Sequence, residues 1–273
     1  MIAMRLTPTS AFFLAFLFLF SAALIIFFVY PLAVLLLIGG EGIPSALRVP
    51  SFELALLVTI ITSSIAALVA VLLGTPLAYL LTRFDFRLKG LVEALVDIPI
   101  AVPHIIVGVM IVLAFAPQLG LGRYLHALHL SVVDTLLGAS MAVTYVSATY
   151  AVRVIESALL SLDPETELVA MTLGASRLRT FFAVVLPRVK RAIATGALTA
   201  WARAASEAGA LLIVAFQVYL GRSLIYPAPV AIYEAYVGLG IIEAARFSAA
   251  MLIVVLGVFL AARYIMQRGR RTA

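Results

Sequence analysis

Six long runs of apolar residues, separated by shorter polar or basic segments, dominate the sequence. They cover residues 11–38, 54–81, 91–116, 132–152, 193–216 and 241–265. A helix needs about 20 residues to cross the hydrocarbon layer of a bilayer, and each run is long enough. The runs lack the strict alternation of apolar and polar residues that is typical of a membrane β-barrel. The pattern therefore predicts an all-α integral membrane protein with six transmembrane helices.

The composition agrees with this prediction. Of the 273 residues, 64% are hydrophobic and only 12% are charged, whereas soluble domains are about half apolar and a quarter charged. The first run is longer than the apolar core of a signal peptide, which has about 7–15 residues, so we expect it to be retained as a span. The absence of cysteine excludes disulfides and thiolate metal sites.

The distribution of basic residues predicts the orientation. Most arginines and lysines fall in the N-terminal residues, in 82–90, in 153–192 and in the C-terminal tail. The segments on the other side carry only Arg48, Arg123, Arg222 and, at the rim of the last span, Arg246. The positive-inside rule places the first set, and with it both termini, in the cytoplasm. The net charge of +6 forms no basic stripe with interleaved aromatic residues, so nucleic acid is not an expected partner; the lipid bilayer is.

The cytoplasmic segment 153–192 is long enough to contain structure of its own. Asp163 can cap a helix, Pro164 suits its first position, and Glu165 faces the positive end of the helix dipole. Gly174 fits the left-handed conformation that ends a helix. The segment therefore predicts a short helix between these residues.

A second short helix is predicted after the first. Ser176 can cap it, it extends through Phe182, and Pro187 is expected to break the chain before the fifth span. An apolar face flanked by Arg177 and Arg179 would be exposed. This face could rest on lipid headgroups or dock a partner, and loops of this length with their own helices are more often functional.

The stretch 163–187 resembles the EAA loop of ABC-importer membrane subunits. That pattern is an acidic and alanine cluster, then G-A-S, F and L-P. The matching residues are Glu167, Ala170, Gly174, Ala175, Ser176, Phe181 or Phe182, Leu186 and Pro187. The position six before the glycine, a glutamate in the family, holds Leu168 here, and Glu167 precedes it.

The resemblance implies the type I ABC-importer permease fold and a coupling loop that docks into a separate ATPase subunit. The docking residues would be Glu167, Ala170, Gly174, Ala175, Ser176, Arg177, Leu178 and Arg179. The chain has no G-x-x-x-x-G-K-[ST] phosphate loop. ATP and Mg²⁺ are therefore expected on the partner ATPase, and no cofactor, catalytic residue or metal site is expected in this chain.

The fifth span contains two charges, Arg203 and Glu207. They are four residues apart, share a helix face and can pair. A single charge in the middle of a membrane costs about 2.5–3.5 kcal/mol on insertion scales. The pair could be a structural tie, or, together with Ser206, it could line or gate the translocation pathway.

Three segments resemble molybdate/tungstate permeases within this family. They are A-R-x-x-x-E-x-G around Arg203 and Glu207, D-I-P-I-A-V-P-H at 97–104 and A-P-V-A-I-Y-E at 228–234. The resemblance implies import of an oxyanion, molybdate or tungstate, with an extracellular or periplasmic substrate-binding protein and a second copy of the chain. Tyr233 and Glu234 are the candidate contacts for the binding protein.

We therefore expect a single permease domain in the cell membrane, which is not an enzyme. A permease for sulfate or another anion is the alternative within the family. A stand-alone secondary carrier is a further alternative, although Glu207 is the only acid deep in a span that could bind its coupling ion. A membrane-embedded enzyme is disfavoured because the sequence has no HExxH motif and no G-x-S-x-G elbow.

Overall fold

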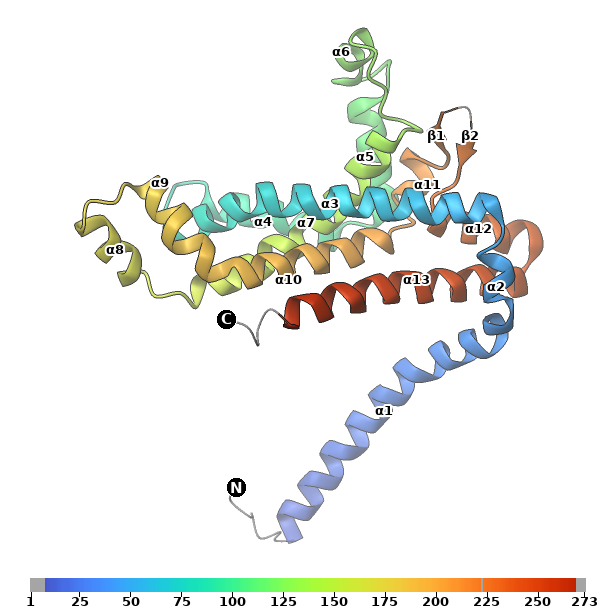
Figure 1. The fold of residues 1–273 in the computed structure, drawn as a ribbon, viewed down its shortest axis with the longest axis horizontal. Helices are drawn as coiled ribbons and strands as arrows, with labels where there is room; N and C mark the ends of the chain where they lie inside the picture. Colours follow the sequence, from blue (N-terminus) through green and yellow to red (C-terminus); the bar gives the residue numbers. More distant parts are fainter. Residues whose placement is uncertain (1–7, 222, 269–273) are drawn as a thin grey trace.

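A computed structural model of the chain describes residues 8–221 and 223–268 (Figure 1). Five helices run side by side along one direction. They are α3 (Pro50–Arg83), α4 (Lys89–Ala101), α7 (Leu136–Leu160), α10 (Leu186–Ala205) and α13 (Ile241–Arg268). The centre of the bundle is formed by α3, α7 and α10, which pack against one another. Ala70, Ala151 and Ala200 are buried where they meet, because small side chains let helices approach closely without a hydrophobic force between them.

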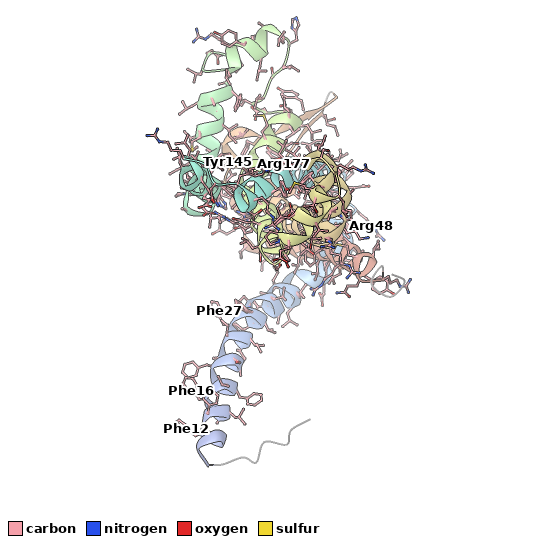
Figure 2. The ribbon with its side chains drawn as sticks, turned by 90° about the vertical axis from the view of Figure 1, so that its left-hand side faces the viewer. Phe12, Phe16, Phe27, Arg48, Tyr145 and Arg177 are labelled. Carbon is pink, nitrogen blue, oxygen red and sulfur yellow. The ribbon has the colours of Figure 1, made fainter. Side chains whose placement is uncertain are left out.

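The first helix, α1 (Pro8–Gly39), leaves this bundle obliquely. Side chains 12–32 are all exposed, and Phe12, Phe16 and Phe27 project away from the helix with no neighbouring element beside them (Figure 2). Only the end of α1 packs closely, against α13. A Cβ atom on Gly39 would lie 2.3 Å from the carbonyl oxygen of Ala245, so only glycine fits this contact.

Short elements occupy the two ends of the bundle. One end carries α8 (Glu165–Thr172), α9 (Arg177–Thr180) and the π-helical turn η2 (Phe181–Val185). The other carries η1 (Gly40–Gly42), α2 (Ile43–Ala46), the antiparallel strands β1 (Val218–Leu220) and β2 (Ser223–Ile225), and α12 (Ala228–Leu239). Two helices, α5 (His104–Phe115) and α6 (Gly122–Ala127), project sideways from the bundle. The short α11 (Leu211–Val214) packs against α5.

Three helices of the described residues are individually long and apolar enough to cross a membrane. They give the candidate spans Phe12–Ala46, Pro50–Arg83 and Ile241–Arg268, and the bent pair α4–α5 counts as a fourth if it is one span. The fourth predicted segment, 132–152, is shifted: α7 begins only at Leu136. Asp134 has φ +57°, and the Thr135 hydroxyl accepts a hydrogen bond from the Gly138 amide at 3.2 Å, so a turn and a cap precede the helix.

The third predicted span, 91–116, is bent and consists of two helices, α4 and α5. The chain turns by 116° between α4 and α5. Val102 is extended, with φ −83° and ψ 131°, because the ring of the following Pro103 disfavours the helical conformation there. A new helix then begins at His104.

The fifth predicted span, 193–216, is also interrupted. The helix α10 begins earlier, at Leu186, and stops at Ala205; five residues then separate it from α11. The carboxylate of Glu207 accepts the Ala210 amide hydrogen bond at 2.9 Å, so the helical ladder does not continue through this segment.

Pro187 does not break the chain before α10, contrary to the prediction. It lies within the first two positions of the helix, directly after η2. Proline has no amide proton and its ring collides with a preceding carbonyl in a regular helix, and the wider π turn accommodates both defects. Helical structure therefore runs without interruption from Arg177 to Ala205.

Candidate functional site

The loop between α7 and α10 is fastened to α3 through Glu167. This residue of α8 is buried. Its carboxylate accepts hydrogen bonds from the Tyr79 hydroxyl and from Nε of Arg83, both at 2.7 Å. Nη2 of Arg83 donates to the carbonyl oxygens of Leu159 at 3.0 Å and Leu162 at 2.8 Å. A single arginine side chain thus joins α3, the end of α7 and α8.

The predicted turn chemistry of this loop is confirmed. Oδ1 of Asp163 accepts a hydrogen bond from the Glu165 amide at 2.9 Å. Gly174 has φ +90° and ends the turn between α8 and α9, and Oγ of Ser176 accepts from the Arg179 amide at 3.2 Å. These two hydrogen bonds and the left-handed torsion of Gly174 set the direction of α9 relative to α8.

The fastened loop exposes an apolar surface, which we call the loop patch. It consists of Leu168, Leu173, Leu178 and Phe182, whose exposed fractions are 56%, 83%, 69% and 60%. Arg177 and Arg179 are exposed beside it, and Arg177 lies at the end of the molecule that faces the viewer in Figure 2. The Arg177 guanidinium lies 5.5 Å from the centre of the Phe84 ring, so it stays close to the end of α3.

The predicted docking residues therefore divide into two groups. Leu178, Arg177 and Arg179 reach the surface, whereas Ala170 and Ala175 are half-buried. Glu167 faces inward and holds the loop in place. Tyr79 and Arg83, which the sequence analysis did not select, complete this anchor. No local motif marks them, because they lie more than 80 residues from Glu167 in the chain.

A second cluster lies where the α4–α5 break meets the α10–α11 break. A Cβ atom on Gly209 would lie 2.9 Å from Cβ of His104. Likewise, a Cβ atom on Gly108 would lie 2.7 Å from Cβ of Ile213 and 2.8 Å from the carbonyl oxygen of Ala210. The two helix breaks are therefore in direct contact, and the glycines permit it.

Arg203, Glu207 and His104 form the polar centre of this contact. Nη2 of Arg203 and Nδ1 of His104 each lie 2.9 Å from Oε2 of Glu207. The Glu207 side chain is only 1% exposed, and burial of a carboxylate requires such partners. The predicted pairing of Arg203 with Glu207 is present although the helix ends between them. Ser206 is exposed, with its hydroxyl 3.3 Å from Nη1 of Arg203.

His104, the last residue of the 97–104 segment, is the third member of this cluster. The bend at Pro103 brings the start of α5 against Glu207. A pocket of about 440 Å³ lies beside it, lined by residues 100–105 and Gly209. A cation at the edge of a pocket can attract an anion, and the same contacts can also serve to hold the two breaks together.

Hydrogen bonds between α4 and α7 hold the 97–104 segment in place beside the cluster. The Arg153 guanidinium binds both carboxylate oxygens of Asp97, at 2.9 and 2.6 Å. The Thr149 hydroxyl donates to the carbonyl oxygen of Val96 at 2.6 Å. These bonds hold α4 against α7 just before the bend.

The residues predicted to contact a binding protein lie at the opposite end of the molecule from the loop patch. Both belong to α12, where Tyr233 is 46% exposed. Glu234 is half-buried and lines a pocket of about 320 Å³ with Phe52, Tyr226 and Phe247. Within residues 8–221 and 223–268, no group of three or more histidines and acidic residues could hold a metal ion.

Comparison with known proteins supports the resemblance. The chain is 38% identical over 215 residues to the molybdate/tungstate transport system permease protein WtpB of Thermococcus kodakarensis, which covers 77% of this chain and 82% of the relative. It is 42% identical over 158 residues to WtpB of Pyrococcus abyssi, where the match spans 58% of each chain. The sulfate transport system permease protein CysT of Salmonella typhimurium is 32% identical over 166 residues, or 61% of this chain and 60% of that protein.

The fold is also known from crystal structures. A bacterial ABC transporter involved in the import of the acidic polysaccharide alginate contains a chain that matches with a TM-score of 0.72 at 16% identity, covering 94% of this chain and 96% of that one. Residues 70–269 match the family model of the binding-protein-dependent transport system inner membrane component. This match covers most of the chain, including the anchored loop and both helix breaks. The chain therefore belongs to the family of binding-protein-dependent transport system inner membrane components and is a multi-pass protein of the cell membrane.

Proposed function

We propose that this chain forms the membrane-spanning subunit of an ATP-driven importer that carries an oxyanion, molybdate or tungstate. The observation that carries the proposal is the loop patch, an exposed apolar surface with two arginines on a loop that is fastened to the bundle by Glu167. Such a surface suits a partner protein better than water. The chain is a permease and not an enzyme, so the energy for transport comes from that partner.

The loop patch is the docking surface for an ABC ATPase subunit. Leu173 and Leu178 supply apolar contacts, and Arg177 and Arg179 supply charge at the rim. Glu167, buried beneath the loop, and Gly174 and Ser176, in its turn, set the shape of the loop. ATP and Mg²⁺ bind the ATPase, and its closure pulls on α9.

The paired helix breaks are the gate of the translocation pathway in this proposal. Arg203 supplies a positive charge next to the pocket beside His104, and Ser206 is exposed next to it. An oxyanion that reached Arg203 would compete with Glu207 for the guanidinium. Arg203 would therefore release Glu207, bind the passing anion, and pair with Glu207 again once the anion has left.

The proposed topology has six spans in a single permease domain, with both termini in the cytoplasm. The bent pair α4–α5 and the interrupted pair α10–α11 supply two of these spans. A second copy of the chain completes the pathway, and the exposed flank of α1 supports this, since its side chains 12–32 have no cover within the described residues. An external substrate-binding protein meets the α12 end through Tyr233 and Glu234.

Molybdate and tungstate are favoured over sulfate by the relatives. Over the aligned residues, two permeases named for molybdate and tungstate are 42% and 38% identical to this chain. The sulfate permease of Salmonella typhimurium is 32% identical. All three anions are tetrahedral dianions, so the membrane pathway would treat them similarly. Sulfate is therefore the second candidate substrate.

The test is uptake in proteoliposomes that contain this chain, its ATPase and its binding protein. We expect ATP-dependent uptake of radiolabelled tungstate that excess molybdate abolishes and an equal excess of sulfate reduces less than twofold. Uptake by this chain without the ATPase would overturn the proposal in favour of a secondary carrier. Scrambling residues 164–182 in correctly inserted protein is expected to abolish uptake, and full uptake by that variant would also contradict the proposal.

A further inference from the structure

A groove lies between α10 and α13, away from both sites described above. Its volume is about 700 Å³, within the range of about 300–1,000 Å³ that is typical of ligand pockets. The two helices converge at its inner end, where Trp201 and Phe259 belong to one apolar cluster. The groove opens toward the first turns of α10 and the last turns of α13.

The mouth of the groove is basic. Lys190 and Arg191 come from the start of α10, Arg263 comes from the last turns of α13, and all three are exposed. None of the ion pairs found among the described residues involves these three cations. By the distribution of basic residues, this end of the bundle faces the cytoplasm. The mouth therefore concentrates positive charge at the level of the lipid headgroups.

The interior of the groove is apolar. At a rise of about 1.5 Å per residue, Leu198 lies about 12 Å further along α10 than Lys190, and Phe259 lies about 6 Å further inside than Arg263. The two hydroxyls in the wall already donate within their own helix. Thr195 donates to the Arg191 carbonyl oxygen at 2.9 Å and Thr199 to that of Thr195 at 2.6 Å. The interior therefore offers no ready donor to a dissolved anion.

We infer that this groove binds an anionic phospholipid, with the phosphate at the three cations and an acyl chain along Leu198 and Phe259. The groove is basic at its mouth and apolar inside, and such a lipid has an anionic headgroup followed by apolar acyl chains. The two arrangements therefore match. Basic pockets between helices on the cytoplasmic side are suited to anionic headgroups. This inference does not depend on which solute the protein carries.

The test measures binding of phosphatidylglycerol to the delipidated full-length chain in detergent, by native mass spectrometry. We expect one lipid per chain to bind in preference to phosphatidylcholine. Lys190→Gln/Arg263→Gln should weaken this binding about 30-fold, since each cation near an anionic headgroup contributes about fivefold. Arg87→Gln/Arg188→Gln removes two other exposed cations outside the groove and should change it less than twofold.

A second variant tests the apolar half without changing charge. Ala194→Phe fills the groove and should reduce phosphatidylglycerol binding at least tenfold while the melting temperature in detergent stays within a few degrees. If glycerol phosphate or tungstate displaces the lipid, the groove takes a free oxyanion and the inference is wrong. If the groove variants instead convert dimers to monomers in the same spectra, the groove is an interface between copies. Equal binding by all variants would show that the groove is no lipid site.

Discussion

Nε of Arg83 lies 2.7 Å from the carboxylate of Glu167, and this contact joins the end of α3 to the loop between α7 and α10. The two side chains are 11% and 8% exposed, so the pair is shielded from water. Removal of one partner from a buried ion pair leaves an uncompensated charge and costs about 3–5 kcal/mol. The position of the loop patch therefore depends on residues that do not belong to it.

Arg83→Ala is expected to release the loop without altering the loop patch. Amide hydrogen exchange over residues 165–173 should become at least tenfold faster, and co-purification of the ATPase should fall. Lys89→Ala is the control, because Lys89 pairs with a fully exposed Asp85 and exposed pairs contribute little. Unchanged exchange in Arg83→Ala would show that Glu167 does not anchor the loop.

Gly174→Ala should distort the turn between α8 and α9. Gly174 has φ +90°, and a Cβ atom there would meet nothing within 4 Å, so the cost of about 1–2 kcal/mol comes from the backbone alone. We expect weaker binding of the ATPase, about tenfold, with partial recovery in Gly174→Asn. Gly90→Ala, another open position without positive φ, should bind the ATPase normally. Equal binding by all three variants would rule out a role for the left-handed turn.

Glu207→Gln should destabilise the protein by about 3 kcal/mol or more, because Arg203 and His104 lose the buried carboxylate between them. The amide oxygen of the glutamine can still accept the hydrogen bond from the Ala210 amide. The loss of stability in this variant therefore measures the effect of removing the negative charge. Thermal unfolding in detergent measures the effect.

The double variant Arg203→Met/Glu207→Gln separates structure from transport. It removes both charges of the buried pair, and the glutamine amide can still bond to the Ala210 amide and to His104. Uncharged replacement of both partners of a buried pair is often neutral for stability, so the melting temperature should return close to that of the unaltered chain. Uptake of tungstate should remain at least tenfold reduced if Arg203 attracts the anion. Full recovery of uptake would assign the pair a structural role only.

Gly209→Ala should force the two helix breaks apart. Its Cβ would lie 2.9 Å from Cβ of His104 and 3.4 Å from the Ile105 amide nitrogen, and overpacking of this kind costs about 1–3 kcal/mol. We expect a lower melting temperature and slower uptake. Gly257→Ala, where a Cβ meets nothing within 4 Å, should leave both unchanged. Normal stability of Gly209→Ala would mean that the breaks are not in tight contact.

The local chemistry of the loop could be predicted from the sequence because each signal is short-range. Asp163, Gly174 and Ser176 act on amides or torsions within a few residues, and their types reveal these roles. The pairing of Arg203 with Glu207 was predicted for the same reason. The anchor formed by Tyr79 and Arg83 could not be predicted, since it depends on how α3 and α8 pack.

The helix ends were harder to predict where apolar sequence continues through a break. Residues 91–116 and 193–216 are apolar enough to read as single spans, and hydropathy does not distinguish a straight helix from a bent one. The signals at the breaks were present in Pro103 and Gly209. At the α10–α11 break a freed backbone group is satisfied locally, by the hydrogen bond from the Ala210 amide to the Glu207 carboxylate. The close contact of this break with the α4–α5 break depends on the tertiary packing at Gly209 and Gly108.

Helical structure continues without a break from Arg177 to Ala205, and this continuity connects the loop patch to the residues around Arg203 through a single stretch of chain. Its longest part, α10, has 20 residues and is about 30 Å long at about 1.5 Å per residue. If a partner bound at the loop patch tilted α10 by about ten degrees, the far end of the helix would move by about 5 Å. We expect such a movement to reach the Arg203–Glu207 pair, because no unwound segment between the two ends could take up the change in direction.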